Sequence, residues 1–393
     1  GLRGARMMRN GVVITEVALS FVLLIGSGLM LRSFVTLQQI SPGYDPRGLL
    51  TFHLLGRSGG SQPQQRAAFI REIRDRLLAL PGVLEVTAST PFPLAGGFNA
   101  MRWGKEEALA DPSRYQSADY QAVLPGYFET MRTPLLAGRT FTEMDNSPER
   151  KVVIIDQVLA AKAFPNEPAV GKRILIGINM PVEVIGVVAH QRAASFAEPG
   201  REQVFFTDGY VEHGRVARWA IRTAGSPAQY ATGVRAEIAK FGSRVVLTEM
   251  QPMEALVQGA QAKTRFSMLL LGVFAVIAAI LAAVGLYGVL STVVRQRTAE
   301  IGVRMALGAT PTGIFQLVVG HGLRLSFAGI AIGLVAALGL APVMSSMLVG
   351  VQPTDPATFV VICVLFMIIA GAASWLPARR AAALDPRLAL HEE

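Results

Sequence analysis

Four apolar stretches constrain this chain more than any other feature of its sequence. They occupy residues 12–31, 266–290, 314–343 and 357–376, and a helix of about 20 apolar residues crosses the roughly 30 Å hydrocarbon core of a bilayer. Helices are expected because backbone groups in lipid must satisfy their own hydrogen bonds. With 51% hydrophobic and 17% charged residues, the 393-residue chain is too apolar for an ordinary soluble protein. The sequence therefore predicts an α-helical membrane protein with one N-terminal span and three C-terminal spans.

Arginines beside these stretches predict the orientation. The segment before residue 12, the loop at residues 295–304 and the tail at residues 379–387 are basic, whereas the loop at residues 344–356 contains neither Lys nor Arg. Basic loops stay on the cytosolic side. Residues 41–253 are then external, and the net charge of +9 reflects contact with a membrane surface rather than with nucleic acid.

Small residues in the predicted spans indicate where helices pack closely. Gly26 and Gly28 lie in the first span, and Gly329 and Gly333 form a Gly-x-x-x-Gly in the third. Such residues let helix backbones approach one another in lipid. Ordinary small-residue content in a membrane helix would produce the same pattern, so this reading stays a hypothesis.

The long segment between the first and second spans reads as an α+β domain. Its beginning, residues 49–89, and its end, residues 218–248, each follow a strand, helix, strand pattern. Two such units separated in sequence can pair into one split sheet with helices on one face. Residues 91–214 form an insertion between them, with short β-like runs at residues 152–155, 173–176 and 182–188. We expect domains at residues 1–40, 41–255 and 256–393.

The sequence argues against catalysis by this chain. It contains no Gly-x-x-x-x-Gly-Lys-[Ser/Thr] phosphate loop, no nucleophile elbow, and no His or Cys spacing typical of a metal site. We expect no catalytic, cofactor-binding or metal-binding residues.

A short basic segment between the second and third spans has helical spacing of its own. Ile301 and Met305 are four residues apart and share one face, while Val303 and Leu307 share a neighbouring face. Gly308 suits a helix C-cap, and Thr310 followed by Pro311 suits the start of the next helix. The segment is either an amphipathic helix at the membrane surface or a charged loop that only sets topology.

The amino-acid sequence of this segment resembles that of the MacB/FtsX-like ABC permease family. The similar residues are Glu300-Ile301-Gly302-Val303-Arg304-Met305-Ala306-Leu307-Gly308-Ala309, and the phrase from Pro377 to Pro386 resembles that family's C-terminal tail. Residues 41–255 are similar to the MacB-like periplasmic core domain, in which a porter-like sheet is split by an inserted subdomain.

The resemblance implies a permease subunit that transmits motion from ATP hydrolysis in a partner to the external domain, for export or extraction of an unknown substrate. Glu300, Ile301, Arg304, Met305, Leu307 and Gly308 would form the helix that contacts the ATPase. ATP would be bound by that cytosolic partner. The chain would lie in the cell inner membrane with its large domain on the periplasmic or extracellular side. Further partners implied are membrane lipid, a second permease half or a second copy, and a periplasmic adaptor.

Two other functions stay open at this level. One is an FtsX-like regulator that passes ATPase motion to a cell-envelope enzyme, and the other is a membrane-anchored binding or structural protein without an ATPase. The start Gly-Leu-Arg is consistent with half of a duplicated permease or with a chain whose ATPase domain precedes it.

The charge asymmetry predicts the labelling of introduced cysteines. In a Cys363→Ser background, a cysteine at Gln116 should react with a membrane-impermeant thiol reagent in cells whose outer face is accessible. A cysteine at Gln296 should react only after permeabilisation, and labelling at Gln296 in intact cells would contradict the topology.

Overall fold

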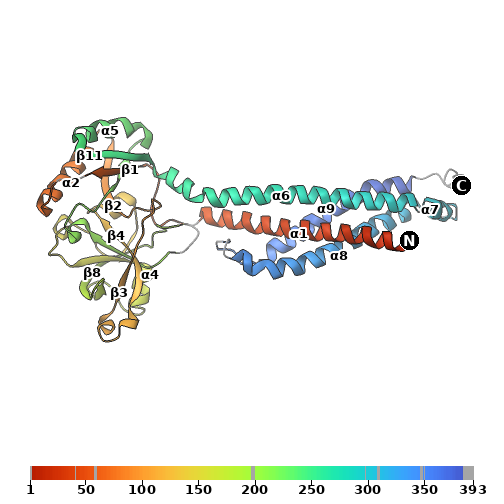
Figure 1. The fold of residues 1–393 in the computed structure, drawn as a ribbon, viewed down its shortest axis with the longest axis horizontal. Helices are drawn as coiled ribbons and strands as arrows, with labels where there is room; N and C mark the ends of the chain where they lie inside the picture. Colours follow the sequence, from red (N-terminus) through yellow and green to blue (C-terminus); the bar gives the residue numbers. More distant parts are fainter. Residues whose placement is uncertain are drawn as a thin grey trace. The chain divides into compact units, whose positions relative to one another are not determined.

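The computed structural model divides the chain into two compact units, which are described in turn (Figure 1). The helical unit comprises Gly1–Gln39 and Lys263–Glu393, and the external unit comprises Ile40–Ala262. Gly308 and the last ten residues of the chain, which include part of the predicted tail, lie outside the described residues. The structure describes residues 2–39, 41–56, 60–195, 200–296, 298–307, 310–345, 348 and 350–383.

Four helices of the described chain are long and apolar enough to cross a membrane. The candidate spans are Asn10–Leu37, Arg265–Gln296, Pro311–Leu340 and Pro356–Ala382. They belong to α1 (Leu2–Gln39), α6 (Met253–Gln296), α8 (Pro311–Ser345) and α9 (Pro356–Ala382). The prediction of four membrane helices in a one-plus-three arrangement is confirmed. The helices exceed the predicted apolar runs because apolarity marks only the hydrocarbon crossing, whereas a helix ends where capping residues intervene.

Helix α8 approaches α1 so closely that two of its glycines have no room for a side chain. A Cβ added at Gly329 would lie 2.4 Å from Val17 Cγ1, and one added at Gly333 would lie 2.9 Å from the carbonyl oxygen of Ala18. The Gly-x-x-x-Gly thus faces α1. On α1 itself, a Cβ at Gly28 would lie 3.0 Å from Thr358 Cγ2 on α9, and one at Gly26 would lie 3.3 Å from Leu271 on α6.

Polar contacts add to this packing. The Ser20 hydroxyl of α1 donates a hydrogen bond to the carbonyl oxygen of Ala278 on α6 at 2.7 Å. Asp355 accepts from the Thr358 N–H at 2.8 Å, which caps α9, and the same carboxylate pairs with Arg32 of α1. The carboxylate therefore ties the end of α1 to the start of α9.

The external unit begins and ends in one antiparallel sheet. Its strands β1 (Leu49–Gly56), β2 (Val83–Thr90), β10 (Arg218–Thr223) and β11 (Val245–Pro252) lie in the order β11-β1-β10-β2. This is the split β-α-β arrangement that the sequence predicts. Because Leu50 pairs with Pro252, the chain enters and leaves this sheet on neighbouring strands.

Helices α2 (Pro63–Leu78) and α5 (Ala231–Ala239) share one hydrophobic core with this sheet (Figure 1). Alternate strand residues reach that core, as period-two geometry requires: Phe52, Trp219 and Ile221 contribute to it, whereas Leu49 and Ala220 belong to another cluster. The helices contribute Phe69, Ile73, Val234 and Ile238.

The insertion between β2 and β10 forms a closed ring of six strands. The neighbours pair in the order β4-β3-β7-β8-β6-β9, and β9 also pairs with β4. Closing a sheet on itself removes its exposed edges. The ring joins the split sheet through Ser89 and Thr90 of β2, which pair with β4. The ring strands are β3 (Ala100–Gly104), β4 (Gln116–Val123), β6 (Val152–Asp156), β7 (Arg173–Ile176), β8 (Met180–Val188) and β9 (Gln203–Thr207), with β5 (Leu135–Gly138) paired to β8.

The predicted β-like runs correspond to β6, β7 and β8, whereas β3, β4, β5 and β9 were not predicted. Strand β4 contains Asp119 and Gln121, which are buried despite their polarity. The Gln121 amide donates to the carbonyl oxygen of Pro91 at 3.0 Å. Because Asp119 and Gln121 are buried among apolar residues, the regular apolar alternation that identifies a strand is interrupted.

A buried carboxylate organises the turn after β5. Asp145 accepts hydrogen bonds from two guanidinium nitrogens of Arg139 at 2.6 and 3.0 Å and from the N–H and hydroxyl of Thr142 at 2.9 and 2.8 Å. Burial by itself would raise the pKa of Asp145, but Arg139 and Thr142 outweigh burial and lower this pKa to about 2. The turn therefore depends on an ionised Asp145.

The glycine contacts predict a destabilising substitution and its control. Gly329→Leu should lower the free energy of unfolding by about 1–3 kcal/mol because its side chain would overlap Val17. Thermal unfolding in one detergent measures the change. A Cβ at Gly339 of the same helix meets no atom within 4 Å, so Gly339→Leu should unfold close to wild type. Equal unfolding midpoints for the two variants would contradict close packing at Gly329.

The lowered pKa of Asp145 predicts a pH dependence with a definite sign. Since the folded pKa lies below the ordinary value of 3.8, the stabilisation is complete above pH 4 and is lost as pH falls towards 2. At pH 7, the free energy of unfolding of Asp145→Asn should be lower than that of wild type by about 1–3 kcal/mol. The gap should narrow between pH 4 and pH 2 in thermal unfolding, and a constant gap over that range would exclude the ionised carboxylate as its source.

Candidate functional site

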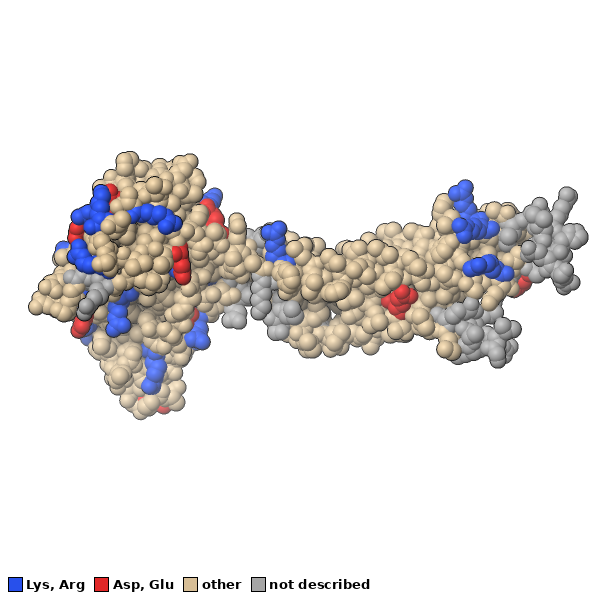
Figure 2. Space-filling view, turned by 45° about the horizontal axis from the view of Figure 1, so that its top comes forward, with Lys and Arg blue, Asp and Glu red and all other residues tan. Residues whose placement is uncertain are grey.

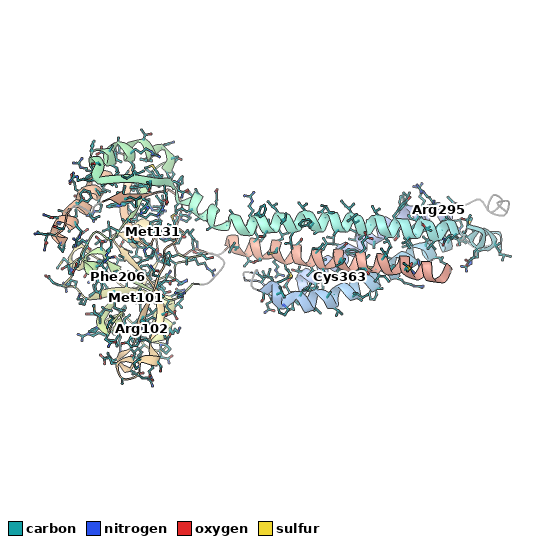
Figure 3. The ribbon with its side chains drawn as sticks, in the orientation of Figure 1. Met101, Arg102, Met131, Phe206, Arg295 and Cys363 are labelled. Carbon is teal, nitrogen blue, oxygen red and sulfur yellow. The ribbon has the colours of Figure 1, made fainter. Side chains whose placement is uncertain are left out.

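The candidate site lies at the end of the helical unit where α6 stops and α8 begins. The short helix α7 (Thr298–Ala306) occupies this connection, and Figure 3 shows Arg295 at this end of α6. The Thr310 hydroxyl and carbonyl oxygens accept hydrogen bonds from the N–H of Gly313 at 3.2 and 2.9 Å. The prediction that Thr310 caps a helix beginning at Pro311 is confirmed.

Basic residues mark this end of the unit. In Figure 2, Lys and Arg side chains gather there, while most of the visible length of the helices shows neither charge. Helix α9 ends with Arg379 and Arg380, and Arg380 donates to the Tyr287 hydroxyl of α6 at 2.9 Å. This arrangement is what a cytosolic membrane boundary requires.

One face of α7 packs inside its own chain. Ile301 is 5% exposed and belongs to the same core as Leu290 and Val294 of α6 and Ile314 of α8. Met305, four residues on, packs against this core as well. The Ile301 side chain is thus buried by the helices beside α7, and Met305 is half-buried in the same way. Contact of these two residues with a partner stays a prediction.

The opposite face of α7 is open. Leu307 is 83% exposed and Val303 is 44% exposed. The Leu307 N–H donates to the Val303 carbonyl oxygen at 3.0 Å, so Leu307 continues the helix and the two side chains share a face. Leu307 was predicted as a contact residue but Val303 was not. Their four-residue spacing places both on one helix face and would have identified Val303 as well.

Glu300 and Arg304 form an ion pair along α7. Arg304 Nη2 lies 2.7 Å from Glu300 Oε1, and each side chain is about half exposed. An exposed i,i+4 pair contributes a few tenths of a kcal/mol to a helix. The pair therefore supports α7 modestly and leaves both charges within reach of a partner.

A cavity of about 220 Å³ lies between α6, α7 and α8. Its walls are apolar at Val293, Ile301 and Leu317 and polar at Arg304 and Arg324. Helix α7 is consequently held by one apolar row and does not fill the space behind it.

The described residues contain no group of three or more His, Cys, Asp or Glu side chains placed to hold a metal ion. The features that distinguish this end of the chain are thus an exposed apolar row, an ion pair and a basic surround. Such a surface can bind another protein.

Comparisons with known protein families match nearly the whole chain. Residues 11–256 match the model of the MacB-like periplasmic core domain, and residues 272–386 match that of the FtsX-like permease C-terminal domain. The first match alone covers more than half of the chain.

Individual relatives carry export functions in their names. The chain is 29% identical over 305 residues to the macrolide export ATP-binding/permease protein MacB of Chromobacterium violaceum, covering 73% of this chain and 46% of that protein. It is 30% identical over 276 residues to the pyoverdine export ATP-binding/permease protein PvdT of Pseudomonas putida, covering 67% of this chain and 41% of that protein. The chain thus spans less than half the length of these relatives.

Among solved structures, the periplasmic region of MacB from Actinobacillus actinomycetemcomitans superimposes with a TM-score of 0.39 at 15% identity. The match covers 57% of this chain and 97% of that one.

Proposed function

Because the chain belongs to the ABC permease family that joins a MacB-like periplasmic core domain to an FtsX-like permease domain, we propose that it couples a cytosolic ATPase to its external domain. In this proposal α7 is the docking element for the ATPase. ATP binding and hydrolysis by the partner displace α7, and the membrane helices carry the displacement outward. The chain itself binds no ATP.

The exposed row of Val303 and Leu307 is the observation that carries this proposal. Leu307 directly follows the nine-residue helix α7 and is 83% exposed, so the described residues leave most of its side chain uncovered. Full burial of a leucine side chain is worth about 1.5–3 kcal/mol. A groove on the partner that accepts this row, with Glu300 and Arg304 at its rim, would be a helix-in-groove contact.

The inner row of α7 supplies the link from docking to motion. Ile301 packs against Leu290 and Val294 of α6, so a push on α7 acts directly on that helix. Helix α6 runs without interruption for 44 residues from Met253 to Gln296, about 66 Å at 1.5 Å per residue. It follows β11 directly. The chain therefore passes from the external sheet into the helix that packs against α7.

The relatives suggest the direction and class of transport. Their names state export of a macrolide and of pyoverdine, and we infer that this chain serves export or extraction of a substrate yet to be identified. The proposed location is the cell inner membrane with the external unit in the periplasm. Helix α6 supports a role for a second permease half or copy, since only 17% of the residues in its most apolar stretch are buried within this chain.

Leu307→Asp should uncouple the permease from its ATPase. A charge in the docking groove should cost about 2–4 kcal/mol of binding, on the scale of an interface hot spot. Insertion should be unaffected because Leu307 is exposed. The measurement is stimulation of ATPase activity, and co-purification, with the ABC ATPase encoded beside or fused to this permease, reconstituted in lipid.

Two control variants sharpen this test. Leu307→Met keeps an apolar side chain and should retain coupling. Ile178→Asp places a charge at a residue of the external unit that is 94% exposed and should also retain it. If Leu307→Asp stimulates and co-purifies with the ATPase as wild type does, α7 is only a topology signal.

A further inference from the structure

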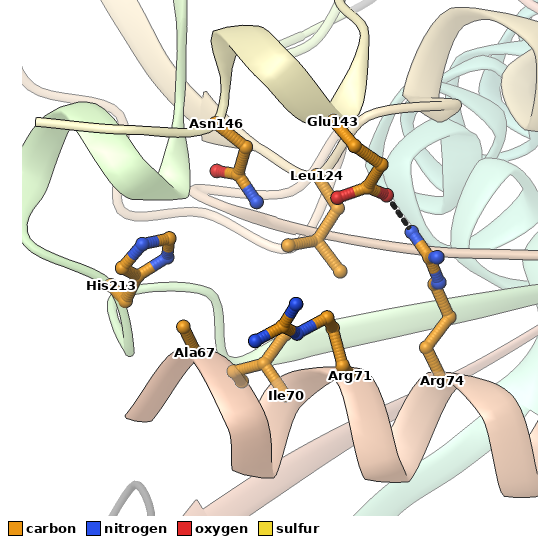
Figure 4. A pocket seen from close by; sticks show the side chains of 8 residues that line it. All are labelled: Ala67, Ile70, Arg71, Arg74, Leu124, Glu143, Asn146 and His213. Atoms are coloured by element: carbon orange, nitrogen blue, oxygen red, sulfur yellow. Dashed lines mark hydrogen bonds and ion pairs between the residues drawn. The ribbon is translucent and has the colours of Figure 1, made fainter. Parts of the chain in front are cut away.

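A pocket in the external unit has no role in the proposed coupling. It has a volume of about 190 Å³ and lies between α2 and the loops that follow β5 and β9 (Figure 4). One wall is the helix face that carries Ala67, Ile70, Arg71 and Arg74 at i, i+3, i+4 and i+7. The opposite wall carries Glu143, Asn146 and His213. A ligand in the pocket would touch both the split sheet's helix layer and the strand ring.

The amide of Asn146 presents a donor to the pocket. Its Oδ1 accepts a hydrogen bond from the N–H of Gly209 at 2.7 Å, which fixes which amide atom is oxygen. The NH₂ group is therefore the free end, and Figure 4 shows it turned towards the pocket. Gly209 permits this approach, since a Cβ there would lie 2.3 Å from the Asn146 backbone.

His213 is held against the pocket by a rigid loop. Glu212 and His213 both have positive φ, at 64° and 62°, which costs free energy for residues other than glycine. Asp208 stabilises the loop by accepting from the N–H groups of Gly214 and Arg215, each at 2.8 Å. Arg66 of α2 donates to the His213 carbonyl oxygen at 3.0 Å. A strained loop secured from two sides fixes the position of the imidazole, which is only 10% exposed.

The charges at the pocket favour an anion. Arg74 pairs with Glu143 across it, so these two charges offset each other. Arg71 is exposed and, among the described residues, makes no hydrogen bond or ion pair. Its guanidinium points into the pocket in Figure 4. A guanidinium and an amide NH₂ that face one space match the acceptors of a carboxylate. The His213 imidazole lines the space beside them, with its Nδ1 3.7 Å from Asp208 Oδ2.

The apolar part of the pocket lining favours an organic anion over an inorganic one. Ala67, Ile70 and Leu124 form the remainder of the wall, and Ile70 and Leu124 are buried by the protein core. Ala67 is the half-buried member of this set, and a ligand with an apolar body would cover its exposed part, whereas an inorganic oxyanion would not. We propose that this pocket binds a small organic carboxylate, with its oxygens near Arg71 and Asn146 and its apolar body against Ala67. The site is independent of ATPase coupling through α7.

Binding of 4-fluorobenzoate to the full-length chain in lipid nanodiscs tests this site through the ¹⁹F linewidth of the probe. Wild type should broaden the signal beyond empty nanodiscs. Arg71→Gln removes one charge-assisted donor and should weaken binding about tenfold. Ala67→Leu fills the pocket without changing its charge and should abolish specific broadening. Arg235→Gln alters an exposed arginine of α5 with no described ion pair and should bind as wild type does.

The outcomes separate the site from nonspecific adsorption. Thermal unfolding of each variant at the wild-type midpoint excludes loss of fold, because Arg71 and Ala67 are not core residues. Equal broadening by wild type, Arg71→Gln and Ala67→Leu would overturn the proposal. Displacement of the probe by an equal concentration of inorganic phosphate would overturn the assignment to organic carboxylates. None of these readouts involves ATP, so they are independent of the proposed coupling.

Discussion

The close approach of α1 and α8 is the contact on which the helical unit depends. Lipid supplies no hydrophobic drive for helices to associate, so their packing relies on backbone proximity and van der Waals contact. Gly329 and Gly333 provide that proximity against Val17 and Ala18. The contact joins segments about 310 residues apart, and it fixes the N-terminal helix to a C-terminal one. The whole external unit is inserted between the two segments that meet there.

The sheet of the external unit makes such an insertion possible. Because β1 and β11 pair side by side, the first and last strands of a domain of more than 200 residues lie together. The strand ring is in turn inserted between β2 and β10, where it does not disturb that pairing. Helix α6 follows β11 directly, so the chain leaves the domain from the strand beside the one where the domain begins. This connectivity suits a permease whose external domain responds to the membrane helices.

Helix α7 divides its two apolar rows between stability and recognition. Ile301 and Met305 contact the helices of the same chain, while Val303 and Leu307 are exposed. The inner row supplies the free energy that seats the helix, since the Glu300–Arg304 pair is exposed and adds little. In the proposed coupling, the outer row contacts the partner ATPase. An amphipathic helix with two separate apolar rows can thus bind a partner through one row while the other stays packed against its own chain.

Much of this architecture was predictable from sequence because the bilayer imposes strong local rules. Apolar runs of sufficient length specified the four membrane helices, and arginine-rich flanks specified an orientation. Periodicity located both halves of the split sheet. Residue spacing also placed Ile301 with Met305 and Val303 with Leu307.

Only the tertiary structure decided which row of α7 faces inward, because both rows are equally apolar and the choice depends on where α6 and α8 lie. The same holds for β4, whose buried Asp119 and Gln121 look like surface residues until their partners are known. It holds also for the pocket formed by Arg71, Asn146 and His213, which come from three distant segments. Neighbouring residues determine secondary structure and membrane helices, whereas contacts between distant segments depend on packing that no single segment determines.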